Sequence, residues 1–250
     1  MSGYGALSAA TYRAFVRDKV TLFFSFVFPL IFLVALGLVF KGQALKNGHH
    51  YIDYIGPGIV AYGIGNGALF GVAYTMMHWR RDEVIRLIRM TPVSSVTVLG
   101  ARYVLTVGVG LVQAGLFVAV ASLPVFGLHL AGTWPLTIPV LLCGITAFFV
   151  IGLLIGSYVS SPEAVGAVSN CVMMPMAFVS GTFYPLDAFP GWLKAISSVL
   201  PLRYMGEGIA GSLTGVRGVG TVGLACAALV AFAAVFGLFS VRFFRWSREK

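Results

Sequence analysis

Two short stretches of the sequence carry residue types that could do chemistry. Residues 218–223 read Gly-Val-Gly-Thr-Val-Gly, the spacing of a dinucleotide-binding loop, which must follow a strand and precede an acidic residue by about 20 positions. A hydrophobic run without that acid follows here, so we interpret the glycines as the entrance to a helix. His49, His50 and Asp53 could together bind a transition metal. Adjacent histidines in a short loop are more often solvated, and we predict no metal site.

Signatures of phosphate and hydrolytic chemistry are absent from the sequence. It contains no Gly-x-x-x-x-Gly-Lys-Ser/Thr phosphate loop, no His-Glu-x-x-His motif and no Gly-x-Ser-x-Gly motif. We therefore predict that this chain is not an enzyme and has no catalytic residue, metal or cofactor of its own.

The densest group of charges lies in residues 79–95. Its charged and terminating residues include Arg80, Arg81, Asp82, Glu83, Arg86, Thr91 and Pro92. Aliphatic residues alternate with these charges, which predicts a short amphipathic helix with i,i+3 and i,i+4 ion pairs to Arg86. Because the loop joins two long apolar runs directly, a push on it would move both. The alternative is a loop at the membrane interface that transmits no movement.

The elements that position these residues belong in a lipid bilayer. The 250 residues are 58% hydrophobic and 10% charged, whereas soluble domains carry about 25% charged residues. The net charge of +9 rests on too few cations for nucleic-acid binding. We predict an all-α integral membrane protein, because the apolar runs are too long for strands. Its six transmembrane helices are expected at about 22–39, 55–77, 98–123, 136–159, 164–183 and 219–241.

The basic residues predict the orientation of the spans. With the N-terminus in the cytoplasm, most Lys and Arg residues lie on the cytoplasmic side, and six spans place both termini there. Residues 1–21, which include Arg13 and Arg17, are predicted to form an interfacial helix. The alternative is an N-terminal segment in solution beside the membrane. Residues 161–163, Ser-Pro-Glu, predict the start of the fifth span through an N-cap hydroxyl, a first-turn proline and an acid.

Small and uncharged polar residues recur inside the predicted spans. Glycines at 63, 67 and 71, and again at 152 and 156, predict close helix crossings within the subunit or across a dimer. Polar groups in lipid bond a neighbouring helix or face a wet cavity, and both interpretations stay open. The candidates for the pathway or the dimer face are Tyr62, Gly63, Asn66, Gly67, Gly71, Thr75, Ser169 and Asn170.

Charged residues avoid the interiors of the predicted spans, with Arg102 near the cytoplasmic end of the third. Ion-driven transporters generally need such charges to bind the coupling ion or relay protons. We therefore expect the driving energy to come from a partner outside the membrane. A self-contained channel or secondary transporter, which would transport without an ATPase, is one alternative. A membrane-embedded enzyme is another, although no catalytic constellation supports it.

Two motifs carry a family resemblance. The charged loop ends in Leu-x-x-x-Thr-Pro-Val at residues 87–93, and a second motif begins with Ser-Gly-Thr-Phe-Tyr-Pro at residues 180–185. The external positions of the second motif are Gly181, Phe183, Tyr184, Pro185, Pro190, Trp192 and Pro201. With Arg13, Arg17 and Pro29, these residues make the whole chain resemble the permease subunits of type-2 ABC exporters of drugs, polysaccharides and lipids. At residues 83–84 the sequence has Glu-Val where the family has Gly-Thr, so the resemblance does not fix which residues contact the ATPase.

The resemblance implies a single permease domain over residues 1–250 that pairs with a second copy or a paralogue. Two cytoplasmic ATPase subunits, which bind ATP and Mg, would contact loop 79–95 and the N-terminal helix. The second and fifth spans would face the dimer axis, and residues 184–216 would form short external helices. The prolines of that segment also favour a re-entrant hairpin before the last span. We expect a multi-pass protein of the cell (inner) membrane that exports a drug-like or lipid amphiphile; a polysaccharide is the alternative.

Overall fold

The computed structural model describes residues 12–13, 15–39, 51–82, 95–183, 186 and 189–243. Throughout these residues the regular structure is helical, which confirms the predicted all-α class. Five helices are long and apolar enough to cross a membrane. They are α4 (Tyr51–Arg81), α6 (Ser95–Ala121), α7 (Thr137–Tyr158), α8 (Pro162–Val179) and α11 (Gly220–Phe243).

The first predicted span is built from three consecutive helical pieces. They are α2 (Lys19–Leu22), the π-helical turn η1 (Phe23–Val27) and α3 (Phe28–Val39). Proline cannot donate the backbone hydrogen bond of a regular helix, and the wider π turn immediately precedes Pro29. Pro29 is buried beside Gly63 of α4. The apolar part of this helix is shorter than the other five, so its crossing of the membrane stays a prediction.

The central helix α4 is longer than the sequence predicted. It contains 31 residues, about 46 Å at 1.5 Å per residue, against a hydrocarbon core of about 30 Å. Hydropathy located only the apolar part, but the helix continues through Asp53 at one end and Arg80 at the other, where both side chains have partners.

The start of α8 agrees with the sequence-based prediction. Ser161 Oγ accepts a hydrogen bond from Ala164 N at 3.2 Å, which confirms the predicted cap.

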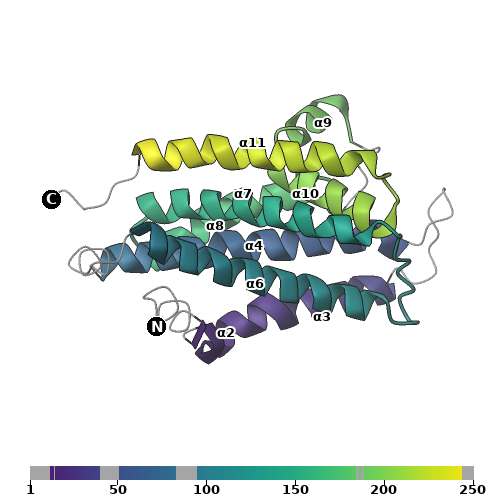
Figure 1. Cartoon of the computed structure of the whole chain (residues 1–250), viewed down its shortest axis with the longest axis horizontal. Coiled ribbons are helices and arrows are strands. Elements are labelled where there is room, and N and C mark those ends of the chain that lie inside the picture. The colour runs from purple at the N-terminus through teal and green to yellow at the C-terminus, as the bar shows by residue number, and fades with distance from the viewer. Residues whose placement is uncertain are drawn as a thin grey trace.

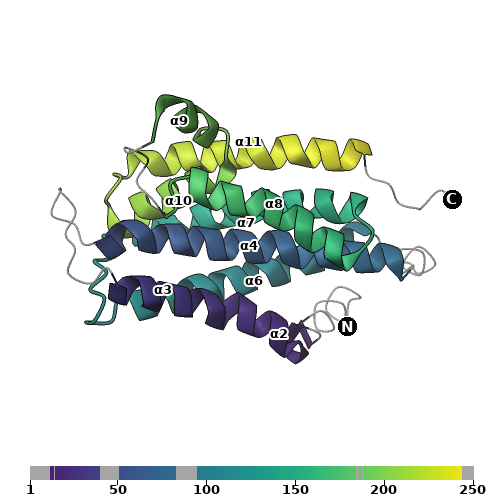
Figure 2. The ribbon, with the colours of Figure 1, turned by 180° about the vertical axis from the view of Figure 1, so that it is seen from behind.

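The long helices run in alternating directions. α2, the last turn of α11 and the Arg81 end of α4 lie at one end of the bundle, and α9 (Gly191–Ser197) lies at the other (Figure 1). Seen from behind, α4 lies between α8 and α3 (Figure 2). α7 packs on α4 and also on α11. The fully buried Leu69, Ile145 and Phe148 mark the core where α4 meets α7.

Glycines let α7 and α4 touch through their backbones. A β-carbon at Gly152 would overlap the carbonyl of Leu69, and one at Gly156 would overlap that of Ala73. The predicted close crossing at these two glycines therefore lies within the chain. Where α4 has the glycine instead, at Gly65, the ring of Phe148 fills the space.

The segment before the last long helix contains α9, α10 (Pro201–Ile209) and the π-helical turn η4 (Ala210–Thr214). α10 is wedged against α4, α7 and α11, and its Leu202 and Met205 are fully buried. Gly144 of α7 makes room for Met205, because a β-carbon there would lie 2.6 Å from the Met205 sulfur. The short helices are present as expected, and re-entry of the pair into the membrane stays a prediction.

We expect Gly152→Ala and Gly156→Ala each to lower the free energy of unfolding by roughly 1–3 kcal/mol, because the added methyl forces two backbones apart. Thermal unfolding in detergent measures the effect. Gly108→Ala and Gly115→Ala on α6 are matched controls, since a β-carbon meets no atom within 4 Å at either position. Equal stability of all four variants would contradict the crossing.

Candidate functional site

One side of α4 carries a half-buried stripe of aromatic and amide side chains. Tyr62, Asn66, Phe70 and Tyr74 are spaced four apart, so they lie on the same face of the helix. We call these four residues the α4 stripe. The hydroxyl of Tyr74 lies against Gly166 of α8, where a β-carbon would be 2.9 Å away. The stripe is therefore on the α8 side of α4.

Four aromatic rings meet where the α4 stripe begins. The ring centroid of Phe183 is 5.6 Å from that of Phe32 on α3, 5.7 Å from that of Tyr62 and 6.0 Å from that of Phe178 on α8. We call these four residues the aromatic cluster. Phe178 is 59% exposed and Phe32 is 38% exposed, so the cluster reaches the surface of the bundle. Such rings stack favourably on planar apolar molecules.

The predicted glycine stripe of α4 faces a different neighbour, α6. The amide of Gln113 lies over Gly63 and Gly67, and the guanidinium of Arg102 lies over Gly71. The Thr75 hydroxyl donates to the carbonyl of its own helix at Gly71, at 2.6 Å. These contacts join helices of one chain.

The two candidates on α8 also separate. Ser169 is fully buried and its hydroxyl has no partner, whereas Asn170 is exposed. Of the predicted pathway residues, only Tyr62 and Asn66 belong to the α4 stripe. Their role in a pathway or a dimer face stays a prediction.

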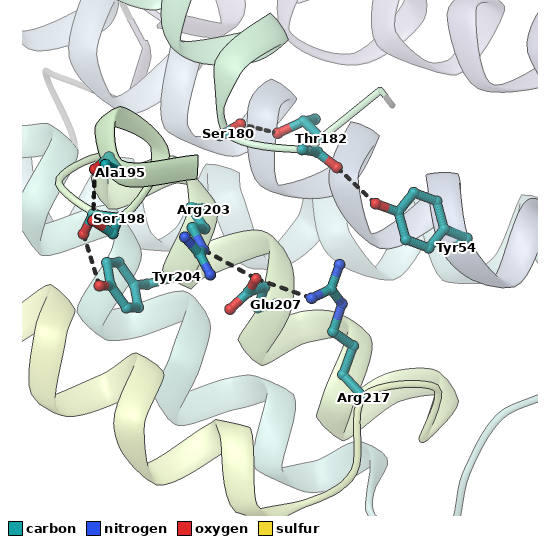
Figure 3. A network of polar contacts seen from close by, with 10 residues as sticks. Tyr54, Ser180, Thr182, Ala195, Ser198, Arg203, Tyr204, Glu207 and Arg217 are labelled. Atoms are coloured by element: carbon teal, nitrogen blue, oxygen red, sulfur yellow. Dashed lines mark hydrogen bonds and ion pairs between the residues drawn. The ribbon is translucent and has the colours of Figure 1, made fainter. Parts of the chain in front are cut away.

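An ion-pair network lies at the α9 end of the bundle (Figure 3). Glu207 Oε1 accepts from Arg203 Nε at 3.1 Å and from Arg217 Nη1 at 3.0 Å. The Arg217 guanidinium also lies 5.8 Å from the ring centroid of Tyr54 on α4, and the Tyr54 hydroxyl donates to the Gly181 carbonyl at 3.1 Å. The carboxylate thus connects α10 to the turn between η4 and α11, and Arg217 and Tyr54 extend the network to α4 and to the segment after α8.

A second set of bonds at this end arises from a proline. Pro57 has no N–H, so the carbonyl of Asp53, four residues earlier, lacks its helical donor. The Thr214 hydroxyl lies 3.2 Å from this carbonyl and shares its one hydrogen between it and the Ala210 carbonyl, which is 2.9 Å away. The Asp53 carboxylate, which is 2% exposed, accepts from the backbone N–H of His129 at 3.2 Å. The first turns of α4 are therefore bonded to η4 and to the loop that precedes α7.

The external motif predicted from the sequence is spread over several elements. Gly181 has φ +79°, which favours glycine, and a side chain there would strike Leu186. The backbone of Thr182 lies directly on Gly58 of α4. Pro190 caps α9, on which Trp192 is 66% exposed, and Pro201 begins α10. Tyr184 and Pro185 lie outside the described residues.

The predicted coupling residues that the structure describes lie at the opposite end of the bundle. Arg80 Nη1 donates to the Gly156 carbonyl at 3.2 Å, which joins the ends of α4 and α7. Arg81 and Asp82 are exposed, as are Arg13 and Arg17 near α2. Glu83, Arg86, Thr91, Pro92, His49 and His50 lie outside the described residues. Over the described parts of the chain, no group of three metal-binding side chains occurs.

The sequence-based reasoning missed the ion-pair network. Arg203 and Glu207 are four residues apart after a helix-starting Pro201, a signal that predicts their pairing. Arg217 comes from beyond η4, and no local spacing points to it. The aromatic partners of Phe183 were missed for the same reason, because Phe32 is far away in the sequence.

Comparison with known proteins adds a family assignment to this geometry. The model of the ABC-2 type transporter family matches residues 3–214. The chain is 25% identical to the inner membrane transport permease YadH of Escherichia coli K12, over 81% of this chain and 80% of YadH. It is 26% identical to the daunorubicin resistance permease DrrB1 of Streptomyces coeruleorubidus, over 93% of this chain and 82% of DrrB1. It is 29% identical to the linearmycin resistance permease LnrN of Bacillus subtilis, over 67% of this chain and 43% of LnrN.

We expect Glu207→Gln to lower the unfolding free energy more than Arg203→Gln or Arg217→Gln, by roughly 1–2 kcal/mol, because it leaves two arginines without a carboxylate. Thermal unfolding in detergent at low salt compares the three variants. Lys194→Gln, at an exposed cation on α9, controls for the positive charge that the two arginine variants lose. An equal effect of Glu207→Gln and Lys194→Gln would contradict the network's role.

Proposed function

Because the chain belongs to the ABC-2 type transporter family and is the membrane permease of an ABC exporter, we propose that the α4 stripe and the aromatic cluster line its export pathway. The substrate is a planar or lipid-like amphiphile that passes between this permease and a second copy or paralogue. Two ATPase subunits supply the energy and bind the ATP and Mg.

The observation that carries this proposal is the side-chain chemistry of the face between α3 and α8. The exposed large apolar side chains of α11 are mostly aliphatic, and they include Leu224, Val230 and Leu238. The α4 stripe instead offers three rings and one amide, and the aromatic cluster stands at its Tyr62 end. Rings provide stacking surface and the amide provides a donor and an acceptor. An amphiphile needs both kinds of contact.

The names of two relatives support an antibiotic-like substrate. LnrN and DrrB1 are named for resistance to linearmycin and daunorubicin. A long polysaccharide would need many hydrogen-bonding groups along its route, and the α4 stripe contains one amide between its rings. An amphiphile therefore fits the face better than a glycan does.

The proposed topology has six spans, of which α3 is the first, and both termini lie in the cytoplasm. The protein is placed in the inner membrane of the cell. Alternating helix directions and the common end of α2 and the last turn of α11 support it (Figure 1). Residues 80–92 then face the ATPases, together with the N-terminal helix. ATP binding closes the ATPases, and the movement passes through α4 and α6, which flank this loop.

We expect Phe183→Leu and Tyr62→Leu to reduce ATP-dependent export of a planar amphiphile by about tenfold, since each removes stacking surface from the pathway. Proteoliposomes that contain the permease and its ATPase, with daunorubicin as the fluorescent probe, measure the rate. Phe239→Leu, an exposed ring on α11, is the matched control. Full export by both pathway variants, with normal assembly of the transporter, would contradict the assignment of these residues to the export pathway.

Coupling is tested separately by Asp82→Ala, Glu83→Ala and Arg86→Ala. We expect each to reduce substrate-stimulated ATP hydrolysis and export together, because the charged loop transmits the movement of the ATPases. Lys194→Ala at the opposite end controls for charge. Unchanged export in the three variants, with the ATPase still bound on affinity purification, would rule out this role.

A further inference from the structure

Arg102 places a guanidinium inside the helix bundle. It lies seven residues into α6, within a segment that qualifies as a membrane span. Its Nη2 donates to the Gly71 carbonyl of α4 at 2.7 Å. Gly71 provides the space, because a β-carbon there would lie 3.0 Å from this nitrogen. The expectation that Arg102 lies near a span end stays a prediction, and the structure adds that its side chain packs along α4.

The charge of Arg102 has no acidic partner among the described residues. Its Nε is buried without an acceptor, and the Gly71 carbonyl, which is shared with Thr75, offers only a dipole. The described acids at this end of the bundle, Asp18, Asp82 and Glu163, are all exposed. At the other end, by contrast, Arg203 and Arg217 share the carboxylate of Glu207.

A structural hydrogen bond does not require this charge. A neutral side chain could donate to the Gly71 carbonyl, and an unpaired cation in an apolar bundle is costly. A buried cation whose one described acceptor is a shared backbone carbonyl is a candidate site for an anion. The side chain is half-buried, so part of it reaches the surface of the bundle between α4 and α6.

The depth of the site fits the headgroup region of one leaflet. Gly71 lies ten residues before the end of α4, about 15 Å, and α4 exceeds the hydrocarbon core by about 16 Å in total. The guanidinium is therefore within two helical turns of the membrane interface. Side chains on a helix lean toward its N-terminus, which for α6 is the end at this interface, and a long arginine extends further in that direction.

We propose that Arg102 binds the phosphate of an anionic phospholipid from the leaflet at this end of the bundle. The phosphate oxygens accept from the guanidinium at the seam between α4 and α6, and the acyl chains lie along the exposed aliphatic residues of α6 nearest that seam, Val112 and Leu116. The lipid neutralises the buried charge. The site is distinct from the α4 stripe and does not depend on which molecule is exported.

The test compares phosphatidylglycerol with phosphatidylcholine bound to the purified full-length permease. Native mass spectrometry counts retained lipids, and thermal unfolding is measured with each lipid. We expect the wild type to retain phosphatidylglycerol about fivefold better, the ratio that corresponds to about 1 kcal/mol per cation, and to unfold at a higher temperature with it. Arg102→Gln should lose both effects. Arg81→Gln, which removes an exposed cation at the same end, should keep them.

Three results would overturn the proposal. One is an undiminished preference for phosphatidylglycerol in Arg102→Gln, or no preference in the wild type. Another is a loss of stability in Arg102→Gln that is equal in both lipids, which indicates a structural bond to Gly71. The third is stabilisation by inorganic phosphate alone that equals the effect of phosphatidylglycerol, which indicates a free-anion site.

Two further variants keep the test decisive if Arg102→Gln does not fold. Arg102→Lys keeps the charge and should retain most of the lipid preference. Gly71→Ala crowds Nη2 and should reduce the preference, while Gly108→Ala on the open side of α6 should not. A full preference in Gly71→Ala together with none in Arg102→Lys would contradict the proposed geometry.

Discussion

The backbone contact between α4 and α7 is the constraint on which the rest of the structure depends. Hydrophobicity does not drive helices together in lipid, so close approach must supply the attraction. At Gly152 and Gly156 no side chain of α7 separates its backbone from the α4 carbonyls of Leu69 and Ala73. Once α7 is seated there, α11 and α10 pack on its outer side, while α6, α8 and α3 pack on the faces of α4 that remain. The α4 stripe is left half-buried on the α8 side.

Polar groups are concentrated at the two ends of the bundle, and they are arranged differently. At the α9 end, the Glu207 network and the bonds to Asp53 connect four parts of the chain that are distant in sequence. At the other end, Arg80 donates to the Gly156 carbonyl, and Arg81 and Asp82 are exposed. The first end is cross-linked within the chain, and the second has charges available for a partner.

The sequence predicted the features that local physics determines. Ser161 capped α8 as expected because the cap involves residues three apart, and apolar runs located the long helices because each run follows one helix. The ends of α4 were missed, since Asp53 and Arg80 are held in the helix by bonds to other elements. The aromatic cluster and the pairing of Arg217 with Glu207 join segments that only the fold brings together. Likewise, Arg102 was placed by its distance from a span end, and only packing on Gly71 defines its surroundings.

The length of α4 gives the Gly152–Gly156 crossing a mechanical consequence. The crossing touches α4 at Leu69 and Ala73, so it divides the rod into unequal arms of about 27 Å and about 12 Å at 1.5 Å per residue. A tilt about this fulcrum moves the two ends in opposite directions, and the longer arm travels more than twice as far. A rigid tilt of α4 that moves the Arg81 end by about 1 Å would carry the Asp53 end through roughly 2 Å, together with the loop and the η4 turn bonded to it.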